Sequence, residues 1–195
     1  LPVHTWWDIG RSDYTAIWFV QYSGREVRFI DYYQKNMQPI KHYAQVLRDR
    51  GYFYATHHLP HDAAHIHLTA KEGMSTQEQF QELMPSEEFE VHKAPLSVKS
   101  AIMQTKGFFS RCVFDEKKTS EGREALGSFA QKWDDKHKVF LDAPSKGWFR
   151  HGCDSFMYAA IGYQEEYNTN LVMDTSNTFM GAMRKKNSGG GRPAI

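Results

Sequence analysis

Residues 3–10 read VHTWWDIG, and residues 11–20 continue as RSDYTAIWFV. Apolar, aromatic and β-branched side chains on both sides of Gly10 predict two strands joined by a tight turn. Asp8 is the acidic residue of the first strand and stands close to its end. Its carboxylate would therefore lie at the surface of a sheet, where it can hold a cation. The stretch predicts a sheet that begins with a hairpin and carries a cation-binding acid.

The rest of the chain predicts further strands interleaved with helices. A third strand follows a turn at Ser23-Gly24, so three antiparallel strands come first. A capping-box pattern that begins at Ser75 marks the start of one helix. Strands are expected at about 3–9, 14–22, 26–33, 54–59, 89–91, 111–114 and 139–141. Helices are expected between Pro39 and Gly51 and at about 75–84, 98–109, 120–133 and 152–167.

One domain accounts for the length and composition of the chain. It has 195 residues, of which 41% are hydrophobic and 24% are charged, as is typical of a soluble globular protein. We expect residues 1–167 to form a single α/β domain, with a mixed β-sheet flanked by helices. Residues 168–195 lack a clear hydrophobic period and include three consecutive glycines, so we expect a partly flexible tail.

Charge and motif content restrict the possible functions. The net charge of +1 gives no global attraction to nucleic acid, so any DNA contact must come from a local basic patch. The two cysteines, Cys112 and Cys153, form no CxxC pair, and we expect reduced thiols in a cytosolic protein. We find no membrane span, signal peptide or ATP-binding GxxxxGK[ST] loop. Because the chain starts at Leu1 and enters a strand almost at once, we expect a fragment of a longer protein.

Three aspartates stand at the ends of predicted elements. Asp8 ends the first strand, Asp62 follows the strand at 54–59, and Asp154 opens the last helix. Mg²⁺ and Mn²⁺ prefer hard oxygen ligands, and hydrolysis with two cations needs several carboxylates in one place. Taken singly, Asp154 is also typical of a helix cap and Asp62 of a turn residue. Their order along the chain favours a shared metal site.

Three motifs that surround these aspartates resemble a known family. They are WDIG with DYTA at residues 7–16, LPHDA at residues 59–63, and HGCDSFMYA at residues 151–159. In order and spacing they resemble the nuclease domain of a tailed-phage terminase large subunit, over roughly residues 3–165. The last motif departs from the usual family pattern, since Met157 stands where an arginine is common.

The resemblance implies a ribonuclease H-like fold and a metal-dependent DNA endonuclease. It assigns catalysis and metal binding to Asp8, Asp62 and Asp154, with two Mg²⁺ or Mn²⁺ ions. Asp8 would bridge both ions, while Asp62 and Asp154 would hold one each. The implied substrate is double-stranded concatemeric DNA, which would be cut with little sequence specificity because backbone contacts carry no base information. The implied partners are an ATPase domain of the same protein, the small terminase subunit and the portal, in the bacterial host cytoplasm. We expect the isolated domain to be a monomer.

Several basic residues are candidates for contacts with the DNA backbone. Basic side chains interleaved with aromatic ones, as around Trp148, favour phosphate contact and base stacking. His151 stands three residues before Asp154 and would contact a phosphate or pair with a helix cap. The expected contacts are Arg11, Lys146, Arg150 and His151, with further candidates at Lys99, Lys106 and Arg111.

Other polar residues near the motifs are open to two interpretations. Asp13 would be a supporting acid or a turn-stabilising residue, and Asp142 is a weaker candidate for an auxiliary acid. A run of histidines suggests zinc, but Pro60 and a polar loop argue against the helix that such a site would use. One or two of them would instead orient water or phosphate near Asp62. These histidines are His57, His58, His61, His65 and His67.

Two rival functions share these sequence features. A structure-selective resolvase of four-way DNA junctions would use the same acids, and such enzymes usually act as dimers. A non-catalytic packaging module would bind DNA or dock on the portal, with the acids serving only structure. Substrate preference separates the first rival from the endonuclease, and metal titration separates the second.

Overall fold

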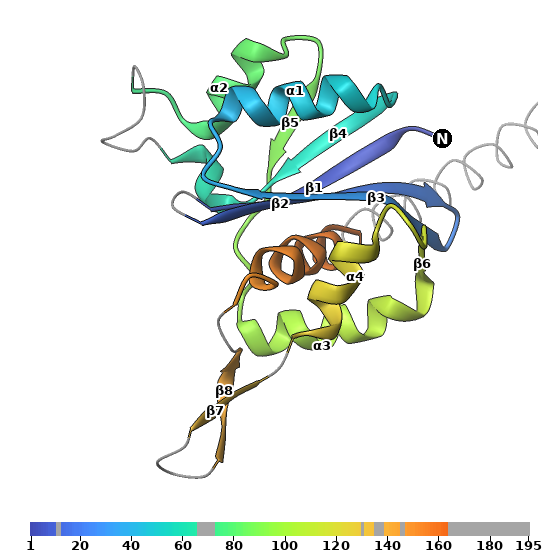
Figure 1. Ribbon diagram of the computed structural model, residues 1–195, viewed down its shortest axis with the longest axis vertical. Coiled ribbons are helices and arrows are strands. Elements are labelled where there is room, and N and C mark those ends of the chain that lie inside the picture. The colour runs from blue at the N-terminus through green and yellow to red at the C-terminus, as the bar shows by residue number, and fades with distance from the viewer. Residues whose placement is uncertain (11–12, 66–72, 130, 135–138, 145–146, 164–195) are drawn as a thin grey trace, which may run out of the picture.

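The computed structural model describes residues 1–10, 13–65, 73–129, 131–134, 139–144 and 147–163. A mixed six-stranded sheet lies between two layers of helices, which confirms the fold class expected from the sequence (Figure 1). The strand order is β5-β4-β1-β2-β3-β6. The strands are β1 (Val3–Ile9), β2 (Tyr14–Ser23), β3 (Glu26–Asn36), β4 (Tyr54–Leu59), β5 (Glu88–Val91) and β6 (Cys112–Phe114).

Helices cover both faces of the sheet. One face carries α1 (Ile40–Arg50) and α2 (Thr76–Leu83), and the other carries α3 (Val98–Phe108), α4 (Ser120–Gly127) and the helical residues 150–163 (Figure 1). Two short 3-10 helices, η1 (His61–Ala64) and η3 (Phe109–Arg111), connect elements. Short sequence motifs determine where some of these helices begin or end. Ser75 and Glu78 form the predicted capping box of α2, and Gly51 ends α1 with a left-handed φ of 61°.

All strands of this sheet except β2 run in the same direction. β1 pairs antiparallel with β2 and β2 antiparallel with β3, while β4 lies parallel to β1 and β5 parallel to β4. The carboxyl ends of β1, β4 and β5 therefore reach the same edge of the sheet. Ligand sites in α/β folds lie at such edges.

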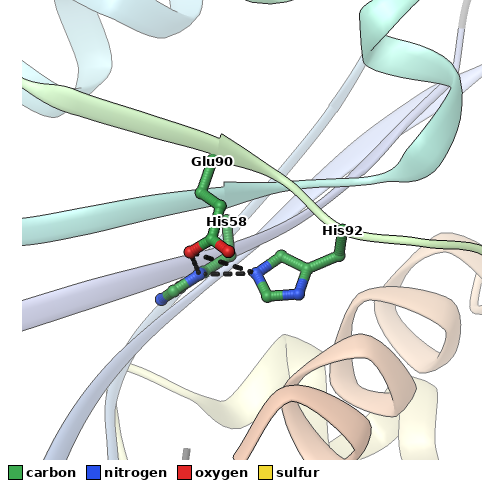
Figure 2. Close-up of side chains that lie close together, drawn as sticks. All are labelled: His58, Glu90 and His92. Atoms are coloured by element: carbon green, nitrogen blue, oxygen red, sulfur yellow. Dashed lines mark hydrogen bonds and ion pairs between the residues drawn. The ribbon is translucent and has the colours of Figure 1, made fainter. Parts of the chain in front are cut away.

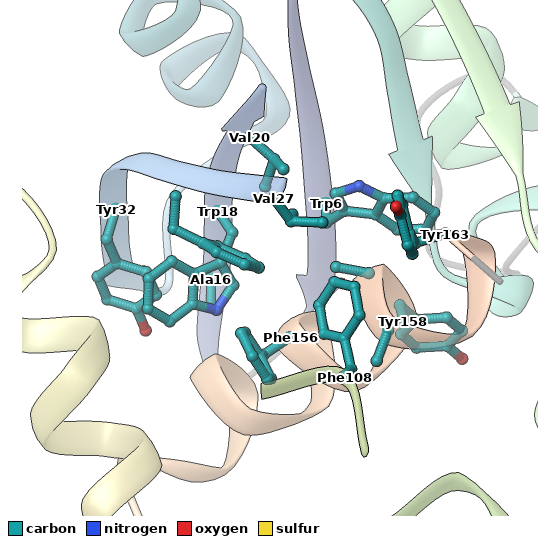
Figure 3. Packing of buried hydrophobic residues seen from close by; sticks show 13 residues of the cluster. Trp6, Ala16, Trp18, Val20, Val27, Tyr32, Phe108, Phe156, Tyr158 and Tyr163 are labelled. Carbon is teal, nitrogen blue, oxygen red and sulfur yellow. The ribbon is translucent and has the colours of Figure 1, made fainter. Parts of the chain in front are cut away.

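Side chains along the first hairpin alternate between the two faces of the sheet and so divide the core into two clusters. Trp6 and Trp18 are register partners and point to the face covered by residues 150–163, together with Phe156 (Figure 3). Trp7 and Ile17 point to the opposite face, beneath α1 and α2. Successive side chains of a strand alternate between faces, so the apolar run that opens the chain fills both layers.

The structure corrects three predicted segments. The helix expected at 120–133 ends at Gly127, where the amide of Ser128 donates to the carbonyls of Glu124 and Ala125. Glycine is a weak helix former, and the aromatic and β-branched residues that follow favour strands. They form a separate antiparallel pair, β7 (Gln131–Asp134) and β8 (Val139–Pro144), that extends away from the helices (Figure 1).

The other two corrections concern the acidic motifs. The loop expected after Asp62 begins as the 3-10 helix η1, and the last helix begins at residue 150 rather than 152. The predicted domain end at residue 167 and the tail at 168–195 lie outside the described residues. Among the described helices, none has the length and apolar character needed to cross a membrane.

Candidate functional site

Asp8 lies near the carboxyl end of β1, on the face that residues 150–163 cover. It pairs in register with Ala16, and its side chain is 19% exposed. The turn that follows is tight, because the amide of Gly10 donates to the carbonyl of Tyr14 at 3.1 Å. A Cβ at Gly10 would lie 2.3 Å from that carbonyl oxygen, so glycine is required there.

His151 connects the two aspartates of the first hairpin. Its Nδ1 lies 2.6 Å from Asp8 Oδ2, and its Nε2 lies 3.2 Å from Asp13 Oδ2. Burial alone would lower the pKa of His151, but the hydrogen bonds and charges of the two carboxylates outweigh it and raise the pKa. The hydrogen bond from His151 in turn lowers the pKa of Asp13. The imidazole thus bridges the two acids, which favour its protonated form.

Asp154 lies in the helix at 150–163, one turn after its start. It is therefore not the cap residue of that helix. Arg150 Nε donates to Asp154 Oδ2 at 3.2 Å. Burial, followed by the negative charge of Asp8, raises the pKa of Asp154 to about 6, although Arg150 and His151 act in the opposite direction. Asp8 and Asp154 are thus two partly buried acids that repel one another.

The start of this helix is held against the sheet by hydrogen bonds to its backbone. Trp18 Nε1 donates to the carbonyl of Gly152 at 2.8 Å, and Gln34 Nε2 donates to the carbonyl of Trp148 at 3.1 Å. Both donors come from the strands β2 and β3. This anchoring places Asp154 over the end of β1 beside Asp8.

Tyr158 brings the third acid into the same region. Its hydroxyl hydrogen-bonds to His61 Nδ1 at 2.7 Å, and His61 is the neighbour of Asp62 in η1. Burial raises the pKa of Tyr158 to about 12, and the charges of Asp8, Asp62 and Asp154 raise it as well. The three predicted acids therefore lie within electrostatic range of one hydroxyl group.

A cavity of about 400 Å³ borders Asp154 on the side away from the sheet. Residues of α3, the end of α4 and the last helix line it, and the basic residue Lys106 is among them. The cavity is lined by Ile102, Thr105, Lys106, Phe109, Leu126, Phe129, Cys153, Asp154 and Met157.

The other residues predicted from the sequence have different surroundings in the structure. Arg150 is bound to Asp154 while its side chain stays 48% exposed, and Cys112 and Cys153 are free thiols. Four other predictions fall outside the described part of the chain. They concern Arg11, Lys146, His67 and the side chain of Asp142.

The predicted histidine run separates into two groups. His57 points into the cluster beneath α1 and α2 and bonds to Thr5 Oγ1 through Nδ1 at 2.6 Å. His58 points to the opposite face, where its nearest partners include His92. Sequence reasoning missed His92, Glu90 and Tyr158. The signal for the first two was their spacing of two residues at the end of a predicted strand, which places both side chains on the same face.

Neither the models of known protein families nor the curated proteins match this sequence. Solved structures of phage large terminases do match its fold. The nuclease domain of the large terminase from bacteriophage SPP1, solved with bound Mn, is 15% identical with a TM-score of 0.56, and the match covers 82% of this chain and 85% of that domain. The P22 large terminase nuclease domain is 15% identical with a TM-score of 0.56, covering 84% of this chain and 81% of that one.

A longer protein shows the same likeness over part of its length. The large terminase of a thermophilic bacteriophage, in complex with ADP, is 15% identical with a TM-score of 0.59. The match covers 80% of this chain but 38% of that protein, so the chain spans well under half of its length. These likenesses confirm the expected ribonuclease H-like class. This chain has the fold of the nuclease domains of bacteriophage large terminases.

Proposed function

We propose that the chain is the metal-dependent DNA endonuclease domain of a phage large terminase and cuts concatemeric genome DNA. One observation carries the proposal. Asp8 and Asp154 come from opposite ends of the chain, yet the charge of Asp8 helps raise the pKa of Asp154 to about 6. Two carboxylates held in mutual repulsion are stabilised by a cation between them. The likeness in fold to a terminase nuclease domain with bound Mn supports this interpretation.

The donor groups suit Mg²⁺ or Mn²⁺, because Asp8, Asp62 and Asp154 offer hard carboxylate oxygens. In this proposal Asp8 bridges two ions, Asp62 holds one and Asp154 holds the other. Bound ions would make a water molecule more acidic and stabilise the leaving oxygen of a phosphodiester. His151 fixes the orientation of Asp8 and competes, when protonated, with cations for the same oxygen. Tyr158 and His61 hold η1, and with it Asp62, against the last helix.

Contacts with the DNA backbone would come from the loop and first turn before Asp154. Trp148 is 38% exposed, and Arg150 keeps an exposed side chain while it binds Asp154. We assign backbone contacts to Arg150 and His151, and also to Arg11 and Lys146. Contacts of this kind carry little sequence information, so cutting would show little sequence preference.

The remaining partners are those of a packaging motor. Because the chain spans 38% of the length of a large terminase, we propose that an ATPase domain belongs to the same protein. The small terminase subunit and the portal would be further partners during virion assembly in the bacterial cytoplasm. We propose that the isolated domain is a monomer.

Digestion of supercoiled plasmid tests the proposal. With Mn²⁺ or Mg²⁺ the domain should nick and linearise the plasmid, and a chelator should stop the reaction. Asp8→Asn should reduce cutting at least about 100-fold, because it removes the ligand shared by both ions. Asp49→Asn, on the exposed face of α1, is the matched control and should cut at the wild-type rate.

Two outcomes would favour the rival functions. A strong preference for four-way junctions over linear duplex would indicate a resolvase. Cutting by Asp8→Asn at the wild-type rate would refute the assigned site, and the absence of both cutting and Mn²⁺ binding would indicate a non-catalytic docking module.

A further inference from the structure

His58, Glu90 and His92 form a second group of metal-binding side chains, apart from the three aspartates. His58 is the penultimate residue of β4, Glu90 lies opposite it in β5, and His92 follows the end of β5 (Figure 2). His58 Nδ1 lies 2.8 Å from His92 Nε2 and 3.6 Å from Glu90 Oε2. His92 Nε2 lies 3.8 Å from the same Glu90 oxygen. Each of these residues offers one possible ligand atom, and the three atoms all lie within 4.8 Å of one another. Among the described residues, this is the group of histidine, cysteine and acidic side chains that meets this criterion.

The spacing of the three atoms fits a transition metal. A tetrahedral zinc ion with ligands at about 2.0–2.1 Å has ligand atoms roughly 3.3 Å apart. The observed separations of 2.8, 3.6 and 3.8 Å lie within about half an ångström of that value. Small rotations of the exposed Glu90 side chain would close the difference. Two imidazoles and one carboxylate favour zinc and similar ions over Mg²⁺, which prefers oxygen ligands alone.

The neighbours of His58 hold its ring in the orientation that a ligand needs. The nitrogen that faces away from the group, Nε2, lies 3.0 Å from His4 Nδ1. A hydrogen bond at this second nitrogen fixes the ring and the tautomer of a metal-binding histidine. The indole of Trp6 stacks on the His58 ring at 3.9 Å between centroids with an angle of 13°. The same indole contacts His92 at 4.8 Å.

Burial and exposure also suit a site with three protein ligands. The side chain of His58 is 1% exposed and that of His92 is 13% exposed, whereas Glu90 is 56% exposed. An ion would therefore enter from the Glu90 side and keep a position open to water.

We propose that His58, Glu90 and His92 bind one divalent ion of the zinc class, with a fourth position open to solvent. The ion would join the short edge strand β5 to β4, since the protein ligands come from both strands and the residue after β5. β4 continues directly into η1, which carries Asp62. The site would therefore stabilise the edge of the sheet from which the loop of the third aspartate departs. The proposal does not depend on the nuclease assignment.

Zinc titration of chelator-treated protein, by calorimetry and by metal analysis after dialysis, tests the site. The wild type should bind one zinc equivalent, and zinc at about a hundredfold above Kd should raise Tm by about 5 °C. Glu90→Gln and His92→Gln change exposed or partly exposed side chains, and each should weaken zinc binding at least about tenfold. Urea unfolding with chelator verifies that both variants remain folded.

Two matched controls separate this site from its surroundings. Glu88→Gln removes the other exposed carboxylate of β5, and Asp8→Asn disables the proposed nuclease site. Both should bind zinc as the wild type does. Loss of zinc binding in Asp8→Asn, unchanged binding in both Glu90→Gln and His92→Gln, or no binding by the wild type would each overturn the proposal.

Discussion

Asp154→Asn should stabilise the protein while it abolishes cutting. The pKa of Asp154 is raised from 3.8 to about 6 in the folded state, chiefly by burial and then by the charge of Asp8. A difference of about two units corresponds to about 3 kcal/mol of unfavourable free energy for the charged form. Asparagine removes that charge, and the shift already includes the opposing contact with exposed Arg150. We therefore expect a gain of about 3 kcal/mol in the free energy of unfolding at pH 7.5.

The pH dependence of this gain follows from the direction of the shift. Between pH 3.8 and about 6 the folded protein binds more protons at Asp154 than the unfolded chain does. The stability of the wild type therefore falls as pH rises through this window, and the full penalty is present above it. The advantage of Asp154→Asn should accordingly be large at pH 7.5 and small at pH 4.

Urea unfolding in the presence of a chelator measures both variants at the two pH values. Asp49→Asn is the control, since an exposed substitution should change the free energy of unfolding by less than about 0.5 kcal/mol. Added Mn²⁺ should stabilise the wild type more than Asp154→Asn, because the variant lacks one proposed ligand. Two results would refute the electrostatic reasoning. One is a variant less stable than the wild type at pH 7.5, and the other is a gain in stability as large at pH 4 as at pH 7.5.

Three further substitutions test packing, capping and protonation. Gly162→Ala should lower the free energy of unfolding in urea by several kcal/mol, because its Cβ would lie 1.9 Å from Trp6 Cη2. Gly127→Ala places its Cβ where no atom lies within 4 Å, so it should be neutral or slightly stabilising. Equal effects of the two substitutions would contradict this packing argument. Ser75→Ala should cost about 1 kcal/mol by removing the capping box of α2, and an unchanged urea midpoint would argue against that role. His151→Gln removes an imidazole whose pKa the neighbouring carboxylates raise above its ordinary value of 6.5. The Mn²⁺ concentration for half-maximal cutting should therefore depend less on pH above that value in the variant than in the wild type, and an unchanged dependence would contradict the competition between imidazole and metal.

Local sequence determined the hairpin and several element ends. The alternation of Trp6 and Trp7 assigned residues to two faces, Gly10 marked the tight turn, and the capping box at Ser75 marked the start of α2. These features depend on contacts within a few residues, and short patterns report such contacts directly. The helix predicted past Gly127 failed because apolar residues at helical spacing continued into residues that pair as a hairpin.

The sequence predicted only part of the arrangement of the acids. Their motifs and order predicted one site, but their mutual charge effects depend on the placement of the last helix over the end of β1. Hydrogen bonds from Trp18 and Gln34, which are far away in sequence, produce that placement. The pairing of Asp8 with His151 and the raised pKa of Asp154 follow from burial, which no local pattern encodes.

The sequence by itself identified the candidate aspartates and the run of histidines, because the types of side chain and their positions at element ends are local properties. Tertiary structure alone decided which of them meet. β4 lies between β1 and β5, so His58 stacks on Trp6 and faces Glu90 and His92 rather than the other histidines of its own segment. Strand order depends on the burial of both sheet faces by the whole chain, and contacts between distant segments are therefore fixed only when the core forms.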